Sequence, residues 1–467
     1  MDLGFETIGN ATVICHDRQP ILVTDPWIRG PAYFGSWTCS HEIPEQQMQT
    51  IMNCEYVWLS HGHPDHLSTD SLELLKDKKI LLPDHYGERI KSDLETAGFD
   101  VQVLQDRVWR QISKNIRIMC IANYNQDAVL LIDLDGTLIV NKNDAIDTGW
   151  GTYVRKLVRG YKCSFLLALS GYGDADMINF FDEEGARILP PAAEKVPPGA
   201  TIAQMTEFFG TKFFVPFSSM HRYQRRDSIW ANQCTTGLDD YAKGFNSRTA
   251  EILPAYIRYD CRRQTVLEIS PRPVQERIFE PEDFGDDWSV PLEGEEASNI
   301  REYFRSIKHL EHAFDYINFR VGGKDNLIEL GGRKMERGIT FEAPRQSLVT
   351  AIEWKIFDDL LIGNFMKTTL HGFGGRGRLY PDFSPYVAKY ADNGQARTPE
   401  ELRIYFEAYR KRAPFEYMRN QVVRHSVKLL DVPTMLIRST LPQESFLYKS
   451  AKRSYIGLRK MLGYSRS

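Results

Sequence analysis

The seven residues from 60 to 66 read Ser-His-Gly-His-Pro-Asp-His and follow a short apolar stretch. Burying three imidazoles and a carboxylate without partners would be costly, so this run is not an ordinary core segment. Neutral imidazole is a good ligand for first-row transition metals, and the alternation of His61 and His63 directs two rings toward one point. Asp65 and His66 then face a neighbouring point. The spacing predicts two adjacent metal sites; the alternative is a solvated loop that is rich in histidine by chance.

A strand followed by this H-x-H-x-D-H run resembles the metallo-β-lactamase superfamily. The resemblance implies an αββα sandwich with a dinuclear metal site at its mouth, a bridging aspartate from a later strand end and a closing histidine. Asp144, after the apolar run 138–140, and His221, after 213–217, occupy those two places. The implied ligands of the two metals are His61, His63, Asp65, His66, Asp144 and His221. Asp65 and His221 are also expected to take part in catalysis.

One part of the sequence departs from that superfamily pattern. The first metal normally takes a third histidine from the segment before a hairpin, and residues 123–128 here read Asn-Tyr-Asn-Gln-Asp-Ala. Asp127 is the predicted ligand, Asn125 is the second choice, and the alternative is that Asp127 merely begins a strand. A carboxylate in place of an imidazole hardens the ligand set and favours iron or manganese relative to zinc. Carboxylate-rich dinuclear iron sites are typical of proteins that use dioxygen.

Longer segments are similar to the metallo-β-lactamase-like part of the CMP-N-acetylneuraminate hydroxylase family. They are residues 56–61, 66–68, 113–119 and 127–144, with a fainter similarity at 357–363. That family is of the oxygenase type and carries a Rieske domain, whose cluster needs two Cys and two His ligands. Here Cys39-Ser40-His41 is the one Cys-x-His, and no Cys-x-x-His occurs. A separate reductase or ferredoxin is therefore expected to deliver the electrons.

Three functions compete. The first is a non-haem diiron monooxygenase that uses O₂ and an external electron donor on a small, anionic substrate. The second is a zinc hydrolase that cleaves a phosphodiester, ester or amide through a metal-bound hydroxide. The third is a binding protein without catalysis, which the nearly complete ligand set disfavours. Iron is preferred over zinc because the third imidazole is missing and because of the hydroxylase resemblance.

Four residues are candidates for substrate contact. Arg222, Tyr223 and Arg225 follow the predicted closing strand, and arginine binds carboxylate or phosphate in a bidentate manner. The alternative is a solvated basic loop. Trp27 lies after Asp25-Pro26, in a segment that flanks the metals in the superfamily, where it either shapes substrate access or belongs to a plain turn.

The elements that must position these residues predict an α/β (α+β) fold. Short β-prone runs at 5–8, 11–15 and 21–24 form one block, and 101–141 forms a second, with Asp135-Gly136 as a hairpin turn. Interleaved helices complete a four-layer αββα sandwich over residues 1–270. A Pro-rich, acidic stretch at 271–296 leads into a C-terminal α+β domain, residues 271–467.

Composition excludes several classes of protein. The 467 residues include 42% apolar and 26% charged residues, as in globular chains. The net charge of −4 indicates no nucleic-acid partner. No apolar run reaches the roughly 18 residues of a membrane span, and no signal peptide is evident, so a cytoplasmic location is expected. Residues 445–467 are basic and amphipathic, and either contact a membrane surface peripherally or, as we prefer, dock on their own domain.

Overall fold

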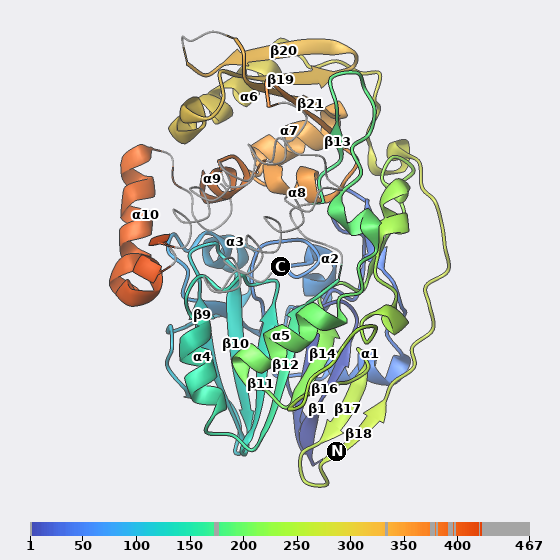
Figure 1. Ribbon diagram of the computed structural model, residues 1–467, viewed down its shortest axis with the longest axis vertical. Coiled ribbons are helices and arrows are strands. Elements are labelled where there is room, and N and C mark those ends of the chain that lie inside the picture. The colour runs from blue at the N-terminus through green and yellow to red at the C-terminus, as the bar shows by residue number, and fades with distance from the viewer. Residues whose placement is uncertain are drawn as a thin grey trace, which may run out of the picture.

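Two β-sheets packed face to face form the larger part of the molecule (Figure 1). The computed structural model describes residues 2–171, 177–331, 335–373, 379, 382–390, 396, 398–419 and 421–422. The first sheet has eight strands in the order β18-β17-β1-β2-β3-β5-β6-β7. Their bounds are β1 (Leu3–Ile8), β2 (Thr12–Asp17), β3 (Gln19–Thr24), β5 (Tyr56–Trp58), β6 (Lys79–Pro83), β7 (Asp100–Leu104), β17 (Ile257–Asp260) and β18 (Thr265–Glu268).

The second sheet has seven strands in the order β16-β14-β12-β11-β10-β9-β8. Their bounds are β8 (Arg110–Gln111), β9 (Ile116–Ala122), β10 (Ala128–Leu134), β11 (Thr137–Asn143), β12 (Cys163–Leu169), β14 (Phe213–Phe217) and β16 (Glu251–Ile252). The β10–β11 hairpin turns at the predicted Asp135-Gly136 pair, with Leu134 opposite Thr137.

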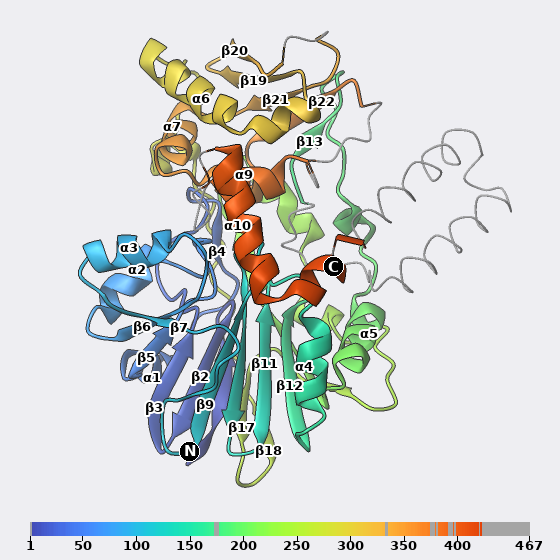
Figure 2. The same cartoon turned by 90° about the vertical axis from the view of Figure 1, so that its left-hand side faces the viewer.

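Helices cover the outer face of each sheet (Figure 2). The first sheet carries α1 (Glu45–Met52), α2 (Thr69–Leu72) and α3 (Arg89–Thr96), and the second carries α4 (Gly151–Val158) and α5 (Gly199–Phe209). The order of layers is helix, sheet, sheet, helix. The predicted four-layer αββα fold is therefore confirmed.

Strand β10 shows why these sequences form buried strands. All seven of its residues are buried. Successive side chains of a strand point to opposite faces, so a strand that is covered on both sides is apolar throughout. Val129 and Leu131 pack in the core beneath the helices, whereas Leu130 and Ile132 pack in the core between the sheets. The central strands are thereby held rigidly, and so are the strand ends that carry the functional residues.

A smaller sheet with its own helices lies over one end of the sandwich (Figure 1). It has the order β13-β22-β21-β19-β20, with β13 (Phe180–Phe181), β19 (Tyr316–Val321), β20 (Lys324–Glu329), β21 (Gly338–Glu342) and β22 (Lys367–His371). Its helices are α6 (Gly294–Ser306), α7 (Arg345–Glu353), α8 (Phe357–Ile362) and α9 (Ser384–Tyr390). Helix α10 (Pro399–Arg412) also contacts the sandwich, where the Tyr405 hydroxyl donates to the Tyr124 carbonyl. Strand β13 comes from the first half of the chain and pairs in parallel with β22. The two halves of the sequence therefore share a sheet.

The basic tail predicted at 445–467 lies outside the described residues. Within the part of the chain that the structure does describe, no helix combines the length and the apolar character needed to cross a membrane.

Arg225 lies at the junction of the two parts and has no exposed surface. Its guanidinium binds both carboxylate oxygens of Asp227, at 2.9 and 3.1 Å. It also binds Oδ2 of Asp286 at 2.7 Å. It also donates to the Phe34 carbonyl and lies over the Phe365 ring, 4.0 Å from its centroid. The prediction that Arg225 contacts substrate therefore needs correction, because two carboxylates and a ring already enclose this charge.

Replacing Arg225 by alanine should lower the free energy of unfolding by about 3–5 kcal/mol, because buried carboxylates would lose their cation. Urea denaturation followed by circular dichroism measures this change. The matched control is Arg226→Ala: the Arg226 side chain is 58% exposed and pairs with Glu280, so its loss should cost less than about 1 kcal/mol. Equal effects of the two substitutions would contradict the role assigned to Arg225.

Candidate metal centre

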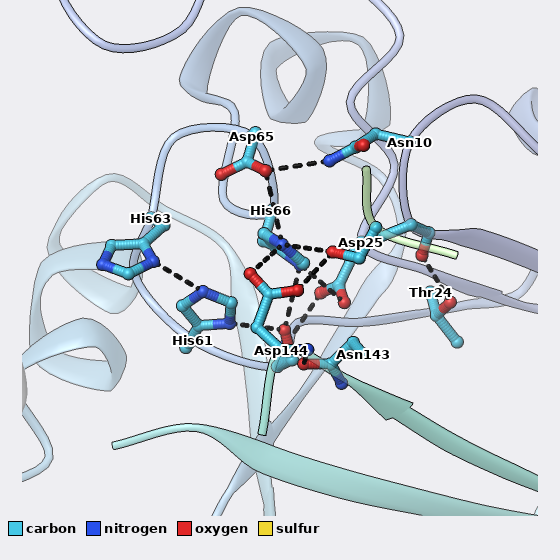
Figure 3. Close-up of polar contacts among 12 residues, drawn as sticks. Asn10, Thr24, Asp25, His61, His63, Asp65, His66, Asn143 and Asp144 are labelled. Atoms are coloured by element: carbon cyan, nitrogen blue, oxygen red, sulfur yellow. Dashed lines mark hydrogen bonds and ion pairs between the residues drawn. The ribbon is translucent and has the colours of Figure 1, made fainter. Parts of the chain in front are cut away.

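Five of the predicted ligands, His61, His63, Asp65, His66 and Asp144, lie close together (Figure 3). Strands β3 and β5 are parallel, as are β11, β12 and β14, so their carboxyl ends lie together. Asp25 follows β3, the 60–66 run follows β5, and Asp144 follows β11. Ser218 follows β14. This topology brings together residues that are up to 193 positions apart in the sequence.

The backbone turns sharply at three of these strand ends. Asp25, Asn143 and Ser218 have φ angles of 41°, 39° and 58°, in the left-handed region that non-glycine residues rarely adopt. A register shift at Asn141/Asn143 interrupts the pairing of β11 with β12. The Asn143 side chain stabilises the turn: its Nδ2 donates to the Ala128 carbonyl, and its Oδ1 accepts from the amide of Asp144. Strained conformations of this kind are maintained where they aim functional side chains.

Two imidazoles and a carboxylate form the first candidate site. His61 Nε2 lies 2.8 Å from His63 Nδ1, so these two nitrogens face the same point. Donor atoms of His61, His63 and Asp144 all lie within 4.8 Å of one another. One ion could therefore reach all three side chains.

His66, Asp65 and Asp144 form the second candidate position. His66 Nε2 is 3.4 Å from Asp65 Oδ2 and 3.4 Å from Asp144 Oδ2. Ser218 Oγ donates to Asp144 Oδ1 and lies 3.2 Å from His66 Nε2. The Asp144 carboxylate thus faces both groups of imidazoles, which is the position that a bridging ligand requires.

Ser60 and Asp25, which the sequence analysis did not predict to orient ligands, hold two of these histidines in place. Ser60 Oγ lies 2.8 Å from His61 Nδ1. The buried carboxylate of Asp25 lies 3.1 Å from His66 Nδ1 and also accepts the amide of Ser60. Metal-binding histidines commonly have their second nitrogen held in this way, which fixes the tautomer and the ring orientation.

Asp65 is held by two side chains, one from the turn between β1 and β2 and one from the loop after β3. Asn10 Nδ2 donates to Asp65 Oδ2 at 2.8 Å, and the Tyr33 hydroxyl donates to Oδ1 at 2.5 Å. Neither residue belongs to a recognisable sequence motif. Asn10 is 55 positions and Tyr33 is 32 positions from Asp65 in the sequence, so the sequence did not predict these contacts.

Asp127 lies in the same electrostatic environment as these groups. It precedes β10, which runs antiparallel to β11, so it lies at the same edge as Asp144. Burial raises the pKa of Asp127 to about 6, the charge of Asp144 adds to the rise, and His63 opposes it. Its role as a ligand stays a prediction.

Burial and the excess of carboxylates shape the other pKa values. Burial alone would lower the pKa of His66, but Asp65, Asp144 and Asp25 outweigh it and hold that pKa well above its usual value. Burial and the neighbouring imidazoles lower the pKa of His61. A buried cluster with this many carboxylates is a favourable place for cations.

His221 lies in β15 (His221–Tyr223), which pairs with β4 (Trp37–Cys39). Its ring stacks on Trp37 with 3.4 Å between centroids and 2° between planes. Burial lowers the pKa of His221 to about 3, against an opposing effect of Asp144. The imidazole is therefore neutral, as a ligand must be. It lies outside the group formed by His61, His63 and Asp144.

The residues predicted to contact substrate bond instead to other residues of the chain. Arg222 alternates with His221 and Tyr223 along β15 and pairs with Glu276 on the opposite face. Tyr223 is buried, and its hydroxyl accepts from Asn364. Trp27 is 1% exposed and donates to the Gly30 carbonyl. With Arg225 also enclosed, the argument for an anionic substrate from these arginines no longer holds.

No protein-family model matches the chain. Among curated proteins it is similar to cytidine monophosphate-N-acetylneuraminic acid hydroxylases. The Cricetulus griseus protein is 27% identical over 144 residues, which are 29% of this chain and 26% of that protein. The Danio rerio protein is 30% identical over 132 residues, 26% of this chain and 22% of that protein. The chain thus matches about a quarter of the length of these relatives. The similarity agrees with the resemblance to the CMP-N-acetylneuraminate hydroxylase family that the sequence motifs indicated.

Solved structures resemble the chain more distantly. CmlA, a diiron β-hydroxylase from Streptomyces venezuelae, has a TM-score of 0.34 and 12% identity, covering 57% of this chain and 54% of CmlA. An isothiocyanate hydrolase from Delia radicum gut bacteria has a TM-score of 0.35 and 16% identity, covering 55% of this chain and 98% of that one. Likenesses of this size carry no argument about activity.

Asp127→Ala should remove about one metal ion per chain, because one of the two ions would lose a charged ligand. Elemental analysis of purified protein gives the metal content. Asp100→Ala is the matched control, since this aspartate is 66% exposed at the start of β7, away from the site. Full metal content in the Asp127 variant would remove this residue from the ligand set.

Asp144→Asn should weaken the binding of both ions, because this carboxylate lies within reach of His61 and His63 and also 3.4 Å from His66 Nε2. Stepwise titration of the metal-free protein with Zn²⁺ measures the two affinities separately. A change confined to one ion would show that Asp144 does not bridge.

Proposed function

We propose that this chain is a dinuclear metalloenzyme, and that it is a non-haem diiron monooxygenase acting on a small-molecule substrate. The observation that carries the proposal is the grouping of His61 and His63 with the carboxylate of Asp144, with Asp127 at the same edge. A second carboxylate in place of a third imidazole would harden the donor set, which favours iron over zinc. The sequence similarity to hydroxylases supports the same choice.

The proposal assigns the donor residues to two ions. His61, His63, Asp127 and Asp144 would hold the first, and Asp65, His66, Asp144 and His221 would hold the second. Reduced iron at these positions would supply the activation of dioxygen, with electrons from a separate reductase or ferredoxin.

The chain's own contribution is rigid placement of the ligands. Ser60 and Asp25 orient His61 and His66, while Asn10 and Tyr33 fix both oxygens of Asp65. Trp37 covers one face of the His221 ring and shields it from water. Ligands that are held in place before the ions bind lose little entropy on binding and keep a defined geometry.

A zinc hydrolase is the second candidate. The observation that favours it is the fixed carboxylate of Asp65, which is 2% exposed and bonded through both oxygens. A carboxylate held in this way could orient a metal-bound water for attack on a phosphodiester, ester or amide.

The metal content and its reactivity distinguish the two functions. Protein purified without added metal should contain two irons per chain, and its absorption should change after reduction by dithionite and again on exposure to O₂. Protein in which His61 and His63 are both replaced by alanine is the control, and it should show neither change. Two zinc ions, with turnover of a phosphodiester or ester and no response to O₂, would overturn the monooxygenase in favour of the hydrolase.

A further inference from the structure

Asp358 in α8 is a buried acid of the C-terminal part that faces the metal centre of the other part. The residue is 9% exposed, and its Oδ2 lies 3.4 Å from His63 Nε2. A carboxylate accepts hydrogen bonds, so His63 donates its Nε2–H in this contact. The other ring nitrogen, Nδ1, then carries the lone pair and faces His61 Nε2 at 2.8 Å.

We propose that Asp358 is a positioning residue for the first metal. It would hold His63 in the tautomer and orientation that direct Nδ1 to the ion. The inference rests on the proposed metal centre and adds to it a contribution from the C-terminal part of the chain.

The other two histidines of the 60–66 run provide the internal comparison. His61 has Ser60 at its second nitrogen, and His66 has Asp25. Both of these residues belong to the sandwich. Asp358 completes the set for His63 across 295 positions of sequence. Each imidazole of the run is therefore held at the nitrogen that faces away from its metal position.

The helix α8 can place Asp358 accurately because the preceding residue is anchored in the C-terminal core. Phe357 is fully buried, with ring centroids 5.0 Å from Phe304, 5.2 Å from Phe341 and 5.9 Å from Phe319. A packed aromatic cluster resists displacement, so it transmits its position to the adjoining side chain. The site thus depends on the docking of the smaller sheet over the sandwich.

An ordinary helix-terminal role does not account for Asp358. An acid in the first turn stabilises a helix without any partner side chain, as Glu295 can in α6, so that role requires neither the burial of Asp358 nor its contact with His63. Asp358 is buried, and its Oδ1 makes no hydrogen bond with any described residue. Its contact with His63 is the one polar contact that the described residues give to this carboxylate. Burial of a carboxylate is costly unless such a partner is present.

The test uses the full chain with Co²⁺ as the probe metal. Competition with a chelator gives the affinity for each ion, and proton NMR of the Co²⁺ protein detects the exchangeable imidazole N–H of His63. Asp358→Ala should weaken one of the two ions about 10–100-fold and speed the exchange of that proton. Asp358→Asn keeps an acceptor of the same shape, so its effect should be smaller. Glu295→Ala, an exposed acid in the same part of the chain, should match the wild type.

The inference is overturned if both Asp358 variants match Glu295→Ala in affinity and proton exchange, including the case in which only their thermal midpoint falls. It is also overturned if Asp358→Ala loses one ion even at saturating Co²⁺, because Asp358 would then be a direct ligand. Circular dichroism shows whether each variant folds, and the Asn variant decides if the Ala variant does not. A wild-type protein that binds no Co²⁺ would instead refute the proposed metal centre itself.

Discussion

The burial of several carboxylates beside several imidazoles at one edge of the sandwich is the constraint on which the rest of the structure depends. Asp25, Asp65 and Asp144 all lie around His66, which has no exposed surface. Like charges at this distance repel strongly in a medium of low polarity. Compensating cations, and hydrogen bonds that hold each group in place, therefore stabilise the arrangement. The turned strand ends and the Asn143 side chain fix the position of Asp144, and donors such as Tyr33 bond to the carboxylates.

Local patterns in the sequence were sufficient for most of the sandwich and for the centre of the site. The short β-prone runs 5–8, 11–15 and 21–24 correspond to β1, β2 and β3, and the Asp-Gly turn correctly predicted the β10–β11 hairpin. These elements can be predicted because their apolar runs and turn residues are close in sequence. The 60–66 run could be interpreted because its ligands are adjacent in the chain.

Residues that act through distant partners could not be predicted. Nothing near Asn10 indicates that it contacts Asp65, and nothing near Arg225 indicates that Asp286, 61 positions later, neutralises it. An arginine beside a predicted metal site has the same appearance in the sequence whether it meets a substrate or a carboxylate of its own protein. Tertiary contacts decided that question, and they removed Arg225 from the mouth of the site. The fold class and the order of the ligands were thus accessible, whereas the residues that hold the ligands were not.

The pairing of β13 with β22 has a consequence for how the chain is made. Residues 180 and 181 leave the ribosome long before residues 368 and 369, with which they form a parallel ladder. The sandwich is complete once β17 and β18 have been made, since Gly4 of β1 pairs with Asp260 of β17, whereas this short segment must wait for residues 368 and 369. Assembly of the small sheet is therefore a late event that follows synthesis of residues 368 and 369. The topology therefore implies that the sandwich forms first and the smaller sheet afterwards.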